Sequence, residues 1–152
     1  MYFKDACSLP SMITLYLDGR LHQSELEKLS SIYLKRLEKL PMIRLKVLYY
    51  KDEAQILKLS KAKGHHCFLL SELGTEYSTA TFTKLITPVF EENESFTFFI
   101  GPPDGFSEHL KDELPSISLS KLTFTHEFAY VLLLEQIYRA YCVHTGRSYH
   151  RE

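Results

Sequence analysis

The chain has 152 residues, a length that fits one domain with a proper hydrophobic core. Charged residues make up 24% and hydrophobic residues 45%, the balance of an ordinary globular protein, and the formal net charge is −1. Stand-alone binders of bare nucleic acid are usually more basic. A nucleic-acid partner would therefore require a local basic patch or a target presented by a larger particle.

The sequence also indicates the cellular compartment of the protein. No stretch approaches the ~18 consecutive apolar residues of a membrane span, and the first residues lack the apolar run of a signal peptide. Cys7, Cys67 and Cys142 are widely spaced and form no C-x-x-C pair. We therefore expect free thiols that are buried as small hydrophobic residues, in a cytoplasmic protein.

Strand and helix patterns alternate along the chain. Residues 1–11 are predicted to be an N-terminal extension, because the first strand pattern begins at Met12. Apolar, β-rich runs predict strands at 12–19, 43–50, 66–71, 95–100 and 116–120. A helix is predicted to begin with a capping box of Ser24 and Glu27 and to end before Pro41. Further helices are predicted at 52–62, around 82–90 with Pro88 distorting or ending it, at 107–113 and, longest, at 126–143.

This β-α order, repeated five times, predicts an α/β fold with a parallel sheet and helices on both faces. The third strand, HCFLLS (66–71), is apolar enough to be buried on both faces. There is no internal repeat and no linker, so residues 12–152 are predicted to form a single domain.

Small residues follow three consecutive strands, in the segments 70–74, 101–105 and 120–125. Ligands of open α/β sheets bind outside the carboxyl ends of the strands, and small residues let backbone groups approach a ligand closely. Any one of these segments alone is better explained as a tight turn. GPPDG (101–105) is neither a dinucleotide fingerprint nor a P-loop, which argues against those nucleotide sites.

The last helix is apolar almost all round, which predicts burial on more than one side. In so small a domain the second side is most simply another subunit in a C2 dimer. Glu135 and Arg139 lie four residues apart in the favourable order, either as a structural salt bridge or as part of a site.

The histidines do not predict a metal site. His126, His144 and His150 match no metal-binding spacing, and the adjacent His65 and His66 point to opposite faces at the start of a strand. The C-terminal run Tyr149-His150-Arg151 is either a solvated end or a segment held in place for chemistry.

Four motifs of the C-terminal third occur in order: FFIGPPDGF (98–106), SLSKLTFTH (118–126), LLLEQIYRA (132–140) and HTGRSYHRE (144–152). They resemble the motifs of the large-subunit ribosomal RNA methyltransferase H family, of the SPOUT class. Members of that family show I-G-G-P-E-G, L-S-x-x-T-x-P-H, E-Q-x-Y-R-A and a terminal Y-H-R-E. This chain departs from the pattern at four positions: Ser71 replaces an acidic residue, Pro102 a glycine, Thr125 a proline and Tyr130 an arginine.

The resemblance implies a SPOUT-like fold with a C-terminal trefoil knot and a homodimer. It implies an enzyme that uses S-adenosylmethionine to methylate ring nitrogen 3 of a pseudouridine in 23S rRNA of the assembled ribosome. The segments after the strands then become cofactor loops, with the binding residues Leu70, Ser71, Gly101, Pro102, Ser120, Lys121, Leu122, Thr123, Phe124 and Thr125.

The resemblance also gives the C-terminal tail a role, because in the family it completes the active site across the dimer. The implied catalytic residues are Arg139, Tyr149, His150 and Arg151, and the implied substrate-binding residues are His126, Tyr149 and Arg151. Either His150 accepts the imide proton, or Arg151 stabilises the anionic ring, while Tyr149 stacks on the base.

An alternative from another class is a non-catalytic or weakly active ribosome-binding SPOUT dimer. Pro102 and Tyr130 favour this alternative, because proline lacks an N–H and tyrosine lacks the charge of arginine. The intact Tyr-His-Arg terminus favours the enzyme.

Overall fold

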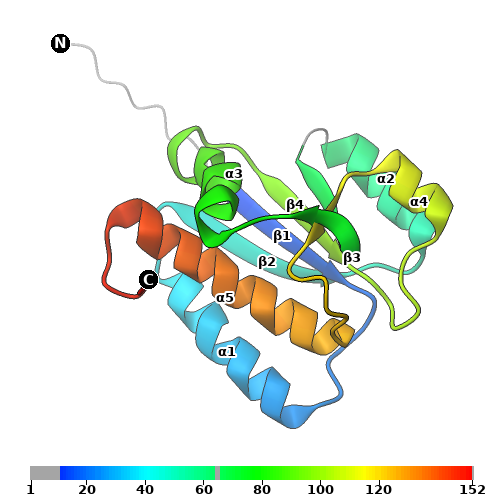
Figure 1. Cartoon of the computed structure of the whole chain (residues 1–152), viewed down its shortest axis with the longest axis horizontal. Coiled ribbons are helices and arrows are strands. Elements are labelled where there is room, and N and C mark those ends of the chain that lie inside the picture. Colours follow the sequence, from blue (N-terminus) through cyan, green and yellow to red (C-terminus); the bar gives the residue numbers. More distant parts are fainter. Residues whose placement is uncertain (1–10, 64–65, 152) are drawn as a thin grey trace.

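The computed structural model describes residues 11–63 and 66–151 of the chain. Strands and helices alternate as predicted (Figure 1). The elements are β1 (Ser11–Leu17), α1 (Ser24–Glu38), β2 (Ile43–Tyr49), α2 (Glu53–Lys63), β3 (Cys67–Glu76), α3 (Thr79–Glu91), β4 (Phe96–Ile100), α4 (Glu108–Glu113), β5 (Ser116–Ser118) and α5 (His126–Thr145). The proposed N-terminal extension, 1–11, and Cys7 lie outside the described residues, except that Ser11 begins β1.

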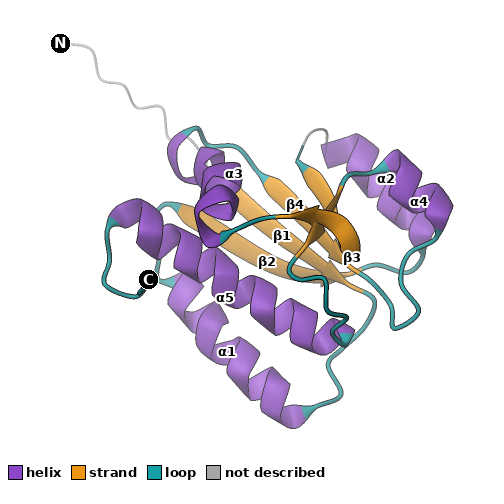
Figure 2. Ribbon diagram, in the orientation of Figure 1, coloured by secondary structure: helices purple, strands orange, loops and turns teal. Residues whose placement is uncertain are grey.

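The strands form one parallel sheet in the order β2-β1-β4-β3-β5. Helices cover both faces, as predicted: α1, α3 and α5 lie on one side, and α2 and α4 on the other (Figure 2). A hydrophobic core lies on each face of the sheet, and alternate residues of β1 pack into one core or the other. Ile13, Leu15 and Leu17 pack under α1, α3 and α5, whereas Tyr16 packs under α2 and α4.

Strand β3 differs from its prediction, because it continues to Glu76 and contains the segment 70–74 that was expected to follow it. Leu70 and Thr75 both pair with Ile117, so residues 71–74 bulge out of the ladder. A Cβ on Gly74 would lie 2.6 Å from the carbonyl carbon of Ser116, so only glycine allows this close approach.

The expected burial of β3 on both faces is wrong for one face. Cys67 and Leu69 are buried, but Phe68 and Leu70 are only half-buried. The reason is the position of β3 next to the short β5, beyond the helices that cover the centre of the sheet.

The predicted capping box of α1 is wrong. Ser24 is the first residue of the helix, and the N-cap residue, Gln23, makes no side-chain cap. Instead, the buried carboxylate of Glu127 accepts hydrogen bonds from the backbone N–H groups of His22 and Gln23. A tertiary contact from α5 therefore replaces the local cap. In α3, Pro88 lies in the last turn and the helix continues past it to Glu91.

Helix α5 packs between α1 and α3 and over the sheet, which explains most of its apolar surface. Its buried residues are Glu127, Tyr130, Val131, Leu133, Leu134, Ile137, Ala140, Tyr141 and Cys142. The outward stripe begins with the exposed Phe128 and continues through Leu132, Glu135 and Arg139. Gly146, at φ +72°, ends the helix in the left-handed conformation. None of the helices described is long and apolar enough to cross a membrane.

Candidate active site

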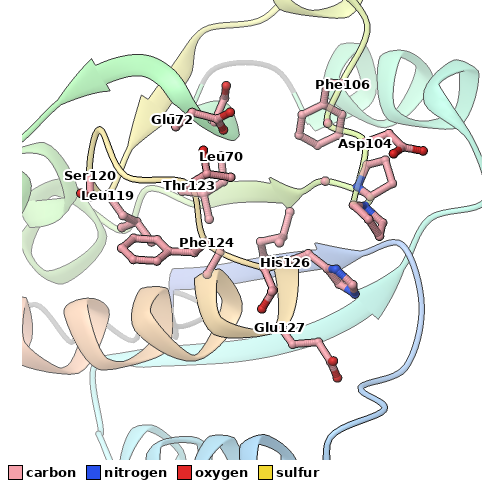
Figure 3. Close-up of a pocket in the computed structure, with 18 of the residues that line it drawn as sticks. Leu70, Glu72, Asp104, Phe106, Leu119, Ser120, Thr123, Phe124, His126 and Glu127 are labelled. Atoms are coloured by element: carbon pink, nitrogen blue, oxygen red, sulfur yellow. The ribbon is translucent and has the colours of Figure 1, made fainter.

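A cavity of about 650 Å³ opens at the carboxyl ends of the strands, where three segments meet (Figure 3). They are the bulge of β3, the loop that follows β4 and the loop that joins β5 to α5. Of the ten residues predicted to bind a cofactor, the cavity is lined by Leu70, Ser71, Gly101, Pro102, Ser120, Leu122, Thr123, Phe124 and Thr125. The structure thus brings together segments that are separated by as much as fifty residues.

Lys121 is the predicted residue that does not line the cavity. Its side chain is 84% exposed, and its ammonium group lies 3.5 Å from a carboxylate oxygen of Glu76. The backbone between Ser120 and Leu122 turns this side chain toward β3 rather than into the cavity. A hydrogen bond from the backbone N–H of Leu122 to the Ser120 hydroxyl, 3.1 Å long, holds that turn.

The loop after β4 is fixed from both sides. The Tyr50 hydroxyl, which is buried, donates a 3.0 Å hydrogen bond to the carbonyl oxygen of Ile100, at the end of β4. At the far end of the loop, the hydroxyl of Ser107 donates to the carboxylate of Glu53, and Ser107 caps α4. Gly105, at φ +76°, closes a turn onto the carbonyl oxygen of Pro102. The shape of the loop is therefore fixed by hydrogen bonds within the protein itself.

Burial also affects the ionisation of Tyr50. Removal from water raises the pKa of Tyr50, and the carboxylates of Asp18 and Glu53 raise it further. The phenol therefore stays protonated and keeps its hydrogen bond to β4 at any physiological pH.

Several residues that line the cavity were not among the predicted binding residues, and the most informative are Glu72, Asp104 and Phe106. The family pattern has an acidic residue at the position of Ser71. In this chain the acidic residue nearest that position, Glu72, follows immediately after it. The ring of Phe106 lies 3.0 Å from where a Cβ on Gly101 would stand, so it packs against the glycine of the loop. The GPPDGF motif could have identified Asp104 and Phe106.

His126 and Glu127 line the cavity at the start of α5. The Nε2 atom of His126 lies 4.0 Å from a carboxylate oxygen of Asp18, at the end of β1. The hydroxyl of Thr125 caps α5 by accepting from the backbone N–H of Phe128. The proline of the family pattern is thus replaced by a residue that caps the helix.

The C-terminal tail is organised around the carboxylate of Glu135. One carboxylate oxygen accepts hydrogen bonds from Arg139 Nε at 3.1 Å and from the Tyr149 hydroxyl at 3.0 Å. Arg139 Nη1 lies 3.1 Å from Nδ1 of His150. Hydrogen bonding to Glu135 raises the pKa of Arg139 further above its usual value. The Glu135–Arg139 pair is therefore both an intrahelical salt bridge and the anchor of the tail.

Aromatic rings complete the attachment of the tail to the protein. The ring of Tyr149 meets that of Tyr138 edge-on, with centroids 4.9 Å apart, and its hydroxyl lies 3.3 Å from that of Tyr33 on α1. The guanidinium carbons of Arg139 and Arg36 lie 4.9 and 5.9 Å from its centroid. Residues up to His150 are thus held against α1 and α5, while Arg151 is exposed.

The tail does not meet the cavity of its own chain. Arg139 and His126 are separated by thirteen residues of α5, or roughly 20 Å at the helical rise. Figure 1 shows the tail at the opposite end of α5 from the loops of the cavity. Of the predicted catalytic and substrate-binding residues, the structure groups Arg139, Tyr149 and His150 with one another, and only His126 with the cavity.

Tyr130, which stands where the family pattern has arginine, is buried and does not line the cavity. Burial raises the pKa of its hydroxyl to about 12. Its side chain therefore contributes to the core beneath α5. Cys67 and Cys142 are also buried. Within the described residues, no group of three or more His, Cys, Asp or Glu side chains is placed to hold a metal ion.

A family model described as "Predicted SPOUT methyltransferase" matches residues 12–150 of the chain. The chain belongs to the SPOUT methyltransferase family. The resemblance carried by the four C-terminal motifs is thereby confirmed, and the protein is a methyltransferase.

Several relatives of this SPOUT methyltransferase are named "Ribosomal RNA large subunit methyltransferase H". The protein from Mycoplasmopsis synoviae is 38% identical over 91% of this chain and 99% of its own length. That from Synechococcus sp. CC9902 is 32% identical over 93% and 98%. The match to the Campylobacter lari protein, at 40% identity, spans 61% of this chain and 60% of that protein. A solved structure, TrmJ from Z. mobilis ZM4, shares the fold with a TM-score of 0.51, at 10% identity over 87% of this chain and 70% of that chain.

Proposed function

We propose that this SPOUT methyltransferase transfers the methyl group of S-adenosylmethionine to ring nitrogen 3 of a pseudouridine in 23S rRNA. Its substrate would be the assembled ribosome in the cytoplasm. The observation that carries the proposal is the cavity at the carboxyl ends of the strands, formed by the loops that the family motifs mark. The names of the relatives support the choice of substrate.

The cavity suits S-adenosylmethionine in size and chemistry. Its volume, about 650 Å³, lies within the range of small-molecule sites. Leu70, Leu119 and Phe124 offer apolar surface, and Glu72 and Asp104 place carboxylates at the rim that complement a cationic ligand. The bound cofactor supplies an activated methyl group, so the protein needs mainly to align donor and acceptor.

A homodimer would bring a tail to each cavity. The tail of a protomer lies roughly 20 Å along α5 from that protomer's own cavity. The outer surface formed by α1 and α5 carries the exposed apolar side chains Leu29, Ile32 and Phe128, the kind of surface that a partner subunit covers. A second copy packed there would supply Tyr149, His150 and Arg151 to the neighbouring site.

The contacts of His150 favour one of its two proposed roles. A guanidinium has no acceptor, so Nδ1 of His150 accepts from Arg139 and the proton of the neutral ring sits on Nε2. Held in this way, the ring presents a donor to the substrate and has no free lone pair. We therefore propose that His150 and Arg151 stabilise the anionic pseudouridine ring while Tyr149 stacks on the base.

We also propose the C-terminal trefoil knot of the family. It is supported by the close approach at Gly74, where the bulge of β3 touches the backbone of Ser116 and Ile117. It is further supported by β5, which returns to pair with β3 after the chain has passed through β4 and α4.

Mass spectrometry of 23S rRNA from cells with and without this protein tests the activity. We expect a methylated pseudouridine that disappears on deletion and returns when the gene is restored. Calorimetry with S-adenosylmethionine tests the cofactor separately. Binding of the cofactor and of ribosomes without any change in rRNA mass would instead support the non-catalytic ribosome-binding dimer, which Pro102 favours because it removes an N–H from the loop.

A further inference from the structure

Charge is distributed unevenly along this nearly neutral chain. Residues 20–63 contain eleven Lys and Arg but five Asp and Glu, whereas residues 64–152 contain six and twelve. The first of these segments comprises α1, β2 and α2. The net charge of −1 therefore includes a strongly basic segment, residues 20–63, whose charge is offset by an acidic segment, residues 64–152.

The basic side chains nearest the tail lie at the C-terminal end of α1. Lys35 and Lys39 are four residues apart on the face of α1 that points away from the core, and they follow Ile32, the last exposed apolar residue of α1 in the surface proposed to meet the partner subunit. Arg36 lies next to them and reaches the rings of Tyr33 and Tyr149. All three are exposed, and none has a carboxylate partner among the ion pairs of the described residues.

The tail adds further positive charge to the same place. Arg147 is held over the ring of Tyr141 at 5.2 Å, and Arg151 is exposed. Figure 1 shows the tail beside the C-terminal end of α1. We define the α1–tail basic surface by the residues Lys35, Arg36, Lys39, Arg147 and Arg151. Guanidiniums that lie on rings keep their N–H edges free for oxygen acceptors.

We propose that the α1–tail basic surface binds phosphates of ribosomal RNA next to the target nucleotide. This inference rests on the proposed function, since it names the surface that docks the substrate. Exposed Lys and Arg side chains without carboxylate partners are complementary to phosphate. Among them, Arg36 lies over the ring of Tyr149, the residue proposed to stack on the base.

The test measures binding of the full-length protein to 70S ribosomes from cells lacking it, over a range of salt concentrations. The variant is Lys35→Gln/Arg36→Gln/Lys39→Gln. The matched control is Lys51→Gln/Lys58→Gln/Lys61→Gln, which removes the same number of exposed charges around α2, on the other face of the sheet. Calorimetry with S-adenosylmethionine checks that both variants keep the cofactor site, and light scattering checks that both keep the oligomeric state of the wild type.

We expect the α1 variant to bind ribosomes at least ~10-fold more weakly at moderate salt, and the slope of log K against log salt to fall by about 2. The control should match the wild type. Equal losses in both variants, or no loss in the α1 variant, would overturn the proposal. Because Arg36 also contacts Tyr149, the double variant Lys35→Gln/Lys39→Gln should retain a slope change of about 1.

Cross-linking distinguishes RNA from a ribosomal protein as the partner. A photoreactive residue, p-benzoylphenylalanine, replaces Lys39, and the adducts formed on 70S ribosomes are analysed. RNA adducts support the proposal, and adducts to protein alone overturn it. The proposed function fails separately: wild-type protein that binds ribosomes through this surface but leaves rRNA mass unchanged would refute the methylation and not the surface.

Discussion

At the scale of single residues, Gly74 decides how closely two segments of the site approach. A side chain there would meet the backbone of Ser116 and Ile117 at 2.6 to 2.8 Å, and backbone cannot move aside as a flexible side chain can. We expect Gly74→Ala to lower the free energy of unfolding by about 1–3 kcal/mol and to weaken binding of S-adenosylmethionine.

Thermal unfolding with and without the cofactor measures both effects. Gly19→Ala is the matched control, because nothing lies within 4 Å of a Cβ at Gly19 and its φ is not positive. Equal behaviour of the two variants would show that the close approach at Gly74 does not require glycine.

Glu127 is the second residue whose role depends on distant contacts. Its buried carboxylate accepts from the N–H groups of His22 and Gln23, more than a hundred residues earlier in the chain. Truncation in Glu127→Ala leaves these donors without a protein partner, and we expect a loss of about 1–3 kcal/mol in stability. Glu127→Gln keeps an acceptor and should recover part of this loss in denaturant titrations. Full stability of Glu127→Ala would mean that the cap contributes nothing.

At the scale of elements, α5 combines a buried side and an outward stripe, and substitutions should separate them. Leu133 is fully buried, so Leu133→Glu should prevent folding. Phe128 is 48% exposed in the protomer, so Phe128→Glu should leave the protomer folded while it disrupts the dimer.

Light scattering at micromolar concentration, together with circular dichroism, measures the two outcomes. Ala129→Glu, next to Phe128 on the rim of the cavity, tests whether assembly responds to any new charge at the start of α5. A dimer that persists in Phe128→Glu would place the interface on another surface.

At the scale of the whole molecule, the tail and the cavity must come from different chains if the proposal holds. Deleting residues 149–152 removes Tyr149 and His150 from their contacts with Glu135, Tyr33 and Arg139. We expect a small loss of stability, little change in cofactor binding, and a fall in methyl transfer of ~10²–10³-fold, measured by transfer of labelled methyl to ribosomes.

Mixed dimers sharpen this test. The tail-deleted chain is combined with a chain in which Thr123 in the cavity is replaced by a bulky residue, as in Thr123→Trp. If the tail acts across the dimer, one of the two sites in a heterodimer is intact and activity should partly return. Loss without rescue would place the action of the tail within its own subunit, and an unchanged rate on deletion would make it a solvated end.

Much of the fold follows from local patterns. Alternating and helical periodicities predicted every strand and helix, because each amphipathic face must be buried against the sheet. The segments that line the cavity also followed from the strand order, since parallel strands end at one edge. The length of β3 did not follow, because its last residues are strand-like only through pairing with β5.

The sequence by itself determined the order of the elements, the parallel sheet, the SPOUT family and the loops of the cavity. These properties depend on spacing within short segments and on motifs that remain together in the chain. Tertiary structure alone decided that Glu127 caps α1, that Tyr130 is buried, that Lys121 points away from the cavity, and that Glu135 anchors the tail far from it. Each of these contacts joins a side chain to a group that the fold brings near, so no local pattern encodes them.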